Sequence, residues 1–173
     1  MSKLKSYSPT ENVLEAAVRR LEEIYTSFSQ VYISVSFGKD STVMLNLAIE
    51  VARRLGKLPV HVLYVDLEGQ YQTTINLAHS TFNRSEVTGH WVCLPLNLRN
   101  AVSVHEPFWR CWDPQVRDRW VRPLPIHSSV VSDQDFFLFY RFGMEFEEFV
   151  QAYGEWFAGE ADTACLVGIR TEQ

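Results

Sequence analysis

Residues 36–41 read Ser-Phe-Gly-Lys-Asp-Ser and could bind phosphate. Gly38 lets the backbone approach an anion closely, Lys39 adds a positive charge, and Ser36 and Ser41 add hydroxyl donors. A β-branched run precedes this hexapeptide and an apolar run with helical spacing follows it, which predicts a strand, a tight turn and a helix. The first amides of a helix have no intrahelical partner and form the positive end of the helix dipole. The sequence therefore predicts a phosphate-binding loop, which we call the phosphate loop.

Spacing excludes two common types of phosphate loop. A Walker A sequence needs a glycine five residues before its Gly-Lys pair, where this chain has Ile33, and a Ser or Thr after the lysine, where it has Asp40. The dinucleotide fingerprint needs three spaced glycines, and this turn contains only Gly38. The remaining alternative is an ordinary strand-to-helix turn without a ligand.

Composition limits the class of protein. The chain has 173 residues, of which 46% are hydrophobic and 21% charged, as expected for one globular domain with a single core. The net charge of -5 excludes nucleic-acid binding through overall charge but leaves a local basic patch possible. No apolar run approaches the roughly 20 residues of a membrane span, and the N-terminus lacks an apolar signal core. We therefore expect a cytoplasmic protein that does not bind membranes.

The cysteines Cys93, Cys111 and Cys165 are odd in number and far apart. This pattern argues against a disulfide framework, a structural zinc site and a four-thiolate iron–sulfur cluster. Cys93 and Cys165 lie in apolar runs, where a thiol is expected to be a small core residue. Cys111 has polar neighbours, so it is the candidate for a reactive thiol.

Further elements must position the loop. We expect helices at 41–55, 71–84 and 143–158, and a first helix capped by Ser8 or Thr10. Strands are expected at 31–36, 60–65, 90–96 and 163–168. These strands are apolar without alternation and separated by helices, which is typical of a parallel sheet covered on both faces. The predicted fold class is α/β and Rossmann-like, with a parallel sheet of about four to five strands.

Polar residues follow two more of the predicted strands. Asp66 and Glu68 come after the second, where Asp66 could hold a metal-bound water or a ribose hydroxyl and Glu68 could contact a metal or substrate. Both could instead cap the following helix. Gly168 and Arg170 come after the last strand; the glycine would allow close backbone approach, and the guanidinium could bind phosphate or sulfate oxygens or simply lie on the surface. Ligands of parallel sheets bind beyond such strand ends.

Residues 108–125, which we call the Trp/Arg segment, combine three tryptophans with four arginines. Tryptophan rings stack on bases and guanidinium groups bind phosphates, so the segment could contact nucleic acid. Alternatively, the tryptophans pack a long inserted loop, at about 99–135, against the domain, and we favour this interpretation. The candidate nucleic-acid contacts are Trp109, Arg110, Trp112, Arg117, Arg119, Trp120 and Arg122.

The phosphate loop resembles the Ser-Gly-Gly-Lys-Asp-Ser loop of the adenine nucleotide alpha-hydrolase (PP-loop) superfamily, in its phosphoadenosine phosphosulfate (PAPS) reductase-like branch. Gly168-Ile169-Arg170 is similar to a motif at the end of that family's fourth strand. The resemblance runs from residue 31 to the end. It departs at Phe37, which replaces the first glycine of the pair and cannot easily adopt a positive φ, so an altered loop is expected.

This resemblance implies ATP or PAPS as ligand, with Mg²⁺, and cleavage between the α- and β-phosphates. It places phosphates on residues 36–41 and Arg170, including Phe37. Lys39 and Asp40 would be catalytic, and Asp40 or Asp66 would hold the metal. The nucleotide or substrate would also contact Asp66, Glu68 and Gly168.

The C-terminal Glu-Cys-Gly-type segment of true PAPS reductases has no counterpart here, so thiol-based reduction is not expected. The prediction is one PP-loop domain, residues 1–173, that is naturally short or truncated relative to the family. The Trp-rich insertion also resembles that of immunoglobulin-binding regulator A-type proteins, which are encoded beside a ParB-like partner and have been linked to transcription. The alternative function is therefore an inactive nucleotide-binding regulator acting with such a partner or with nucleic acid.

Overall fold

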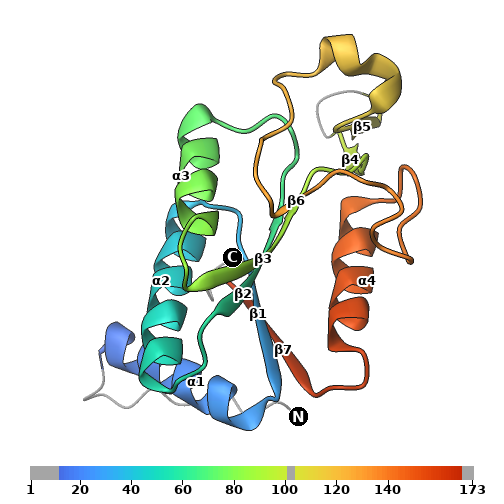
Figure 1. Cartoon of the computed structure of the whole chain (residues 1–173). Coiled ribbons are helices and arrows are strands. Elements are labelled where there is room, and N and C mark those ends of the chain that lie inside the picture. Colours follow the sequence, from blue (N-terminus) through green and yellow to red (C-terminus); the bar gives the residue numbers. More distant parts are fainter. Residues whose placement is uncertain (1–11, 101–103, 169–173) are drawn as a thin grey trace.

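The computed structural model describes residues 12–100 and 104–168 (Figure 1). The four α-helices within these ranges are α1 (Val13–Ser27), α2 (Lys39–Arg54), α3 (Gln72–Phe82) and α4 (Phe146–Ala158). The strands are β1 (Gln30–Ser34), β2 (Val60–Val65), β3 (Val87–Val92), β4 (Asn97–Arg99), β5 (Phe108–Arg110), β6 (Val130–Val131) and β7 (Thr163–Val167). A short 3-10 helix, η1, spans Pro114–Arg119.

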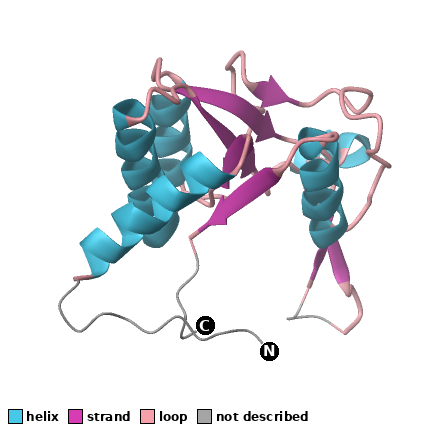
Figure 2. Cartoon of the chain, turned by 90° about the horizontal axis from the view of Figure 1, so that it is seen from below, coloured by secondary structure: helices cyan, strands magenta, loops and turns pink. Residues whose placement is uncertain are grey.

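Five strands form one parallel sheet in the order β6-β3-β2-β1-β7. Helices α1, α2 and α3 lie on one face of this sheet and α4 lies on the other (Figures 1 and 2). The predicted α/β, Rossmann-like class is confirmed. Both faces are covered, which explains why the central strands carry apolar residues at consecutive positions, such as the fully buried Val62 and Leu63 of β2.

The strand order places a topological switch point beside the phosphate loop. From β1 the chain proceeds outward through β2, β3 and β6, and then returns to pair β7 with the opposite side of β1. Tyr32 of β1 faces Cys165 of β7 across this pair. Segments that leave β1 and β7 therefore diverge, and a crevice opens beyond their carboxyl ends.

The predicted starts of α1, β3 and α4 were wrong: α4 begins at Phe146 instead of residue 143, and the other two have identifiable physical reasons. The N-cap of α1 is Asn12, which forms a capping box with Glu15, while Ser8 and Thr10 lie outside the described residues. Strand β3 begins at Val87 instead of residue 90, because Gly89 (φ +136°) packs its bare Cα against the Val62 backbone of β2. The apolar residues 93–96 form a buried connection beyond the strand.

The insertion contributes the edge strand β6, which has only two residues and was not predicted as a strand. It also forms the antiparallel pair β4–β5 and the helix η1, at the top of Figure 1. Among the described residues, no helix combines the length and apolarity needed to cross a membrane.

Candidate functional site

The phosphate loop joins β1 to the first turn of α2. Gly38 is the N-cap of α2, and no side-chain hydrogen bond caps this helix start. The two serines instead stabilise the turn: their hydroxyls lie 3.2 Å apart, and the Ser41 hydroxyl donates to the Gly38 carbonyl at 3.1 Å. The Lys39 side chain is exposed and makes no ion pair with a described residue. This arrangement offers several hydrogen-bond donors and one positive charge to an anion.

Phe37 does not distort the loop as expected from its type. Its φ is +57°, the left-handed conformation that a glycine would adopt, and its side chain is only 5% exposed. The ring packs edge-on against Tyr64, with ring centroids 4.7 Å apart, and near Phe82 at 6.5 Å. A left-handed backbone costs roughly 1–2 kcal/mol, whereas burying a phenylalanine ring contributes roughly 1.5–3 kcal/mol. Burial therefore offsets the strain, and the ring lies in the core instead of the loop.

Gly168, at the end of β7, contacts the loop backbone directly. A Cβ atom at this position would lie 2.7 Å from Ser41 Cα and 2.9 Å from Ser41 N, distances that real Cβ atoms essentially never show. The close backbone approach predicted for Gly168 is thus made to the first turn of α2. Arg170 lies outside the described residues.

A cavity of about 280 Å³ opens at the switch point, and we call it the strand-end cavity. Three predicted site residues line it: Ser36, Ser41 and Gly168. Lys39 and Asp40 do not line it; Asp40 instead lines an apolar groove of about 620 Å³ between α1 and α2. Side chains that were not predicted as site residues also border the cavity: Ser34, Tyr64, Gln70 and Phe146.

Among these unpredicted lining residues, Gln70 had the clearest signal, because it follows the polar cluster after β2. Phe146 begins α4 on the opposite face of the sheet, and its helical spacing indicated only a core position. Tyr64 is buried, and its hydroxyl has no hydrogen-bond partner among the described residues.

Asp66 is buried under the insertion, with 1% of its surface exposed. Its carboxylate accepts hydrogen bonds from Trp91 Nε1 at 2.8 Å and Glu68 N at 3.0 Å, and forms an ion pair with Arg122. The carboxylate is not an N-cap, because α3 begins at Gln72 and its N-cap is Tyr71. Asp66 therefore has a structural role here and does not line the strand-end cavity.

Glu68 holds the Trp/Arg segment in place through hydrogen bonds to its backbone. It is 3% exposed and adopts φ +66°, and its two carboxylate oxygens accept from Trp112 N at 2.6 Å and Val121 N at 2.7 Å. Two backbone donors of the segment are satisfied by one buried carboxylate. Like Asp66, Glu68 does not line the strand-end cavity.

Most of the aromatic and basic side chains of the Trp/Arg segment pack against each other. Trp112 is buried and donates from Nε1 to the Asp66 carbonyl at 2.6 Å, with the Arg122 guanidinium over its ring. Trp120 meets Trp112 edge-on, with centroids 5.2 Å apart. The interpretation that tryptophans pack the insertion onto the domain is confirmed for these residues.

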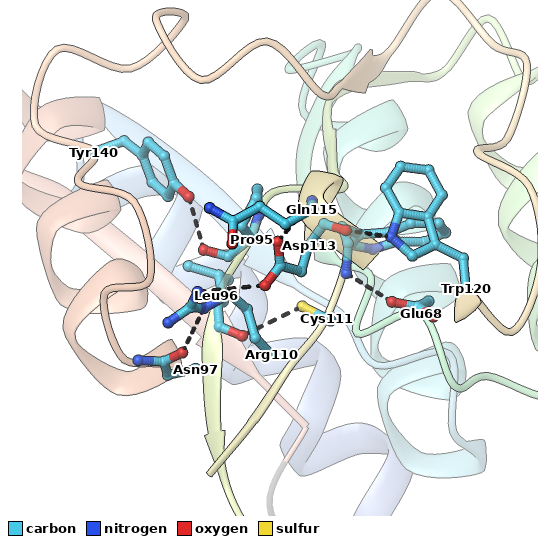
Figure 3. Close-up of polar contacts among 11 residues, drawn as sticks. Glu68, Pro95, Leu96, Asn97, Arg110, Cys111, Asp113, Gln115, Trp120 and Tyr140 are labelled. Carbon is cyan, nitrogen blue, oxygen red and sulfur yellow. Dashed lines mark hydrogen bonds and ion pairs between the residues drawn. The ribbon is translucent and has the colours of Figure 1, made fainter. Parts of the chain in front are cut away.

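Trp109 and Arg119 differ from this packed group. Trp109 is 40% exposed, and Arg119 is exposed without an ion pair to any residue in the described part of the chain. Arg110 is intermediate: it donates to Asn97 Oδ1 at 2.9 Å and pairs with Asp113 at 3.3 Å (Figure 3). Only part of the predicted nucleic-acid surface is therefore available to a ligand.

Two cysteines differ from their predicted environments: Cys111 is buried although its sequence neighbours are polar, and Cys165 is exposed although it was expected in the core. Cys111 is fully buried, and its Sγ lies 3.4 Å from the Leu94 carbonyl oxygen (Figure 3 shows the nearby Leu96 contact). Burial raises the pKa of Cys111 to about 12, so its thiol is not a reactive thiolate. Cys93 is buried as expected, whereas Cys165 is exposed.

Within residues 12–100 and 104–168, no group of three or more His, Cys, Asp or Glu side chains could hold a metal ion by itself.

Comparison with known proteins gives two matches. The phosphoadenosine phosphosulfate reductase domain family matches residues 30–122, from β1 into the Trp/Arg segment. The chain is also 41% identical over 167 residues to the uncharacterized protein YbdN of Escherichia coli (strain K12). That match covers 94% of this chain and 39% of YbdN, so the chain spans about two-fifths of the length of this relative.

Proposed function

Because this chain belongs to the phosphoadenosine phosphosulfate reductase domain family, within the adenine nucleotide alpha-hydrolase superfamily, we propose that it binds an adenine nucleotide at the phosphate loop. The phosphates of ATP or PAPS would contact the first-turn amides of α2 and Lys39. The nucleoside would extend into the strand-end cavity.

The observation that carries this proposal is the uncapped first turn of α2 beside the switch-point cavity. Ser36 and Ser41 line the cavity and shape the turn, so both parts of a nucleotide have adjacent surfaces. At about 280 Å³ the cavity is close to the lower limit of roughly 300 Å³ for small-molecule sites. It fits a nucleoside better than a larger substrate.

If the protein turns over ATP, an oxygen of an acceptor substrate attacks the α-phosphorus, a new P–O bond forms there, and the α–β bond breaks to release pyrophosphate. The amides and Lys39 would stabilise the negative charge of the pyrophosphate leaving group. A magnesium ion bound with the nucleotide would neutralise phosphate charge, and such ions are often held by one or two carboxylates plus phosphate oxygens. Asp40, in the first turn of α2, is the carboxylate that we propose for that role.

The second candidate is a regulator that binds a nucleotide without turnover. The contacts of Asp66 and Glu68 favour this candidate, because these predicted ligand carboxylates bind Arg122 and two backbone amides of the insertion instead. A ParB-like partner, a role in transcription and a cytoplasmic location belong to this candidate as predictions.

The binding proposal is tested by isothermal titration of ATP and of PAPS, each with Mg²⁺, into the full chain. Lys39→Ala should weaken binding roughly 10- to 150-fold, since a charge-assisted hydrogen bond contributes about 1.5–3 kcal/mol. Lys57→Ala is the matched control, because Lys57 is also exposed but precedes β2 at the other end of the sheet. Equal affinity of wild type and Lys39→Ala would disprove the assignment.

Turnover is measured separately as pyrophosphate release from ATP, with and without a cell extract to supply an acceptor. Release that disappears in Lys39→Ala supports the enzyme. Binding without any release under either condition supports the regulator.

A further inference from the structure

A second cavity, of about 260 Å³, lies within the insertion, and we call it the insertion cavity. Three aromatic residues contribute to its lining: Phe108 and Trp109 of β5, and Trp120 after η1. Phe108 and Trp109 are both exposed, so their rings are accessible to a ligand. The guanidinium-bearing Arg119 lines the same cavity.

The acidic residues of the insertion cavity already have partners. Glu68 accepts from two backbone amides, as described above. Asp113 accepts from Gln115 N at 2.9 Å and from the Arg110 guanidinium at 3.3 Å (Figure 3). Arg119 has no such partner within the described part of the chain. Both carboxylates of the cavity therefore have hydrogen-bond donors from the protein, whereas the Arg119 guanidinium remains available to an anionic group of a ligand.

The walls of this cavity are formed before any ligand binds. The Trp120 ring is fixed by a 2.8 Å hydrogen bond from its Nε1 to the Asp113 carbonyl and by the Arg117 guanidinium over its face. The buried Glu68 carboxylate fixes the chain on both sides of η1, at Trp112 and Val121. A preformed site loses little conformational entropy on binding.

A ligand that combines a planar ring with a negatively charged group would match the exposed aromatic rings and the Arg119 guanidinium of this cavity. We infer that the insertion cavity binds one nucleotide, with its base against Trp109 and its phosphate on Arg119. Base–aromatic stacking together with arginine–phosphate contact is how proteins hold unpaired nucleotides. The ligand is either a free mononucleotide or an unpaired nucleotide of a single-stranded nucleic acid.

This inference narrows the seven nucleic-acid contacts predicted from the sequence to two exposed ones. It does not rest on the phosphate loop, because no loop residue lines the insertion cavity. The segment 67–70 nevertheless contributes to both cavities: Leu67 and Gln70 line the strand-end cavity and Glu68 lines the insertion cavity. A nucleotide bound here would lie next to the proposed adenine-nucleotide site.

The test uses the full chain with Lys39→Ala, so that the phosphate loop contributes as little as possible. One arm titrates a mononucleotide by calorimetry, and the other measures fluorescence anisotropy of a short labelled single-stranded oligonucleotide. In whichever arm shows binding, Trp109→Ala should lower the affinity for the ligand roughly 5- to 150-fold. Arg119→Ala should weaken it as well and reduce the slope of log K against log salt by about 0.7 in the oligonucleotide arm.

Arg141→Ala is the matched control, because Arg141 is also an exposed arginine but neither lines the cavity nor contacts a residue named in its walls. Circular dichroism and thermal unfolding establish whether each variant is folded. If Trp109→Ala does not fold, Arg119→Ala alone still tests the inference. Weaker binding by Trp109→Ala and Arg119→Ala, with binding retained by Arg141→Ala, supports the inference. No binding in either arm at millimolar ligand, or equal weakening by all three substitutions, overturns it.

Discussion

The phosphate loop and the Trp/Arg segment both carry positive charge and hydrogen-bond donors, yet they use these groups in opposite ways. In the loop, the Phe37 ring packs into the core, the start of α2 has no side-chain cap, and the Lys39 side chain is exposed. In the segment, Arg122 forms an ion pair with the buried Asp66. Similar composition therefore indicates a binding site in one region and structural contacts in most of the other.

The distance between partners along the chain explains the difference. The loop's hydroxyl contact joins residues five positions apart. The contacts of Glu68 and Asp66 with the Trp/Arg segment join residues 44 to 56 positions apart. A buried carboxylate must have partners, and only the folded insertion supplies them.

The largest expected effect tests whether the segment's charges are structural. Asp66→Ala removes the partner of Arg122, whose side chain is 13% exposed. Leaving one charge of a buried pair uncompensated costs about 3–5 kcal/mol. We expect this loss in the free energy of unfolding, measured with urea. Arg19→Ala is the surface comparison: its pair with Glu23 is half exposed, and its loss should change stability by less than about 1 kcal/mol. Equal losses would remove the distinction between the two regions.

The next effect concerns Phe37 and the strain in the loop. Removing a buried phenylalanine ring costs roughly 3–5 kcal/mol, while glycine relieves a left-handed strain of roughly 1–2 kcal/mol. Phe37→Gly should therefore lower the free energy of unfolding by about 1–4 kcal/mol. Phe37→Ala keeps the strain and should be less stable than Phe37→Gly by about 1 kcal/mol. The reverse order of the two variants would show that φ +57° is not strained here.

The smallest effect tests the contact between β7 and α2. Gly168→Ala must displace the Ser41 backbone, and such overpacking costs roughly 1–3 kcal/mol of stability. Because the displaced turn is the proposed phosphate site, ATP affinity measured by calorimetry should also fall. Gly69→Ala is the control, since its Cβ would meet Trp109 at an ordinary 3.6 Å. If Gly168→Ala is less stable but binds ATP with unchanged affinity, the contact between Gly168 and Ser41 does not shape the ATP site.

The sequence alone determined the phosphate loop, the central parallel strands and the helices that follow them. These features depend on residues close together along the chain, such as the Gly38 N-cap of α2 and the apolar run of β2. Residues that respond to distant partners were harder to predict. The short strand β6 carries no detectable pattern, and the start of β3 depends on the close packing of Gly89 against β2.

Only the tertiary structure decided which polar groups are available to a ligand. Asp66 and Glu68 follow a strand end, as ligand-binding residues do, but their carboxylates are buried against the insertion. Cys111 has polar neighbours in sequence and a buried thiol in space. The same insertion leaves Trp109 exposed. Residue type fixes what a side chain can bind, whereas burial and long-range contacts fix whether that capacity remains available, because a buried polar group must be satisfied within the protein.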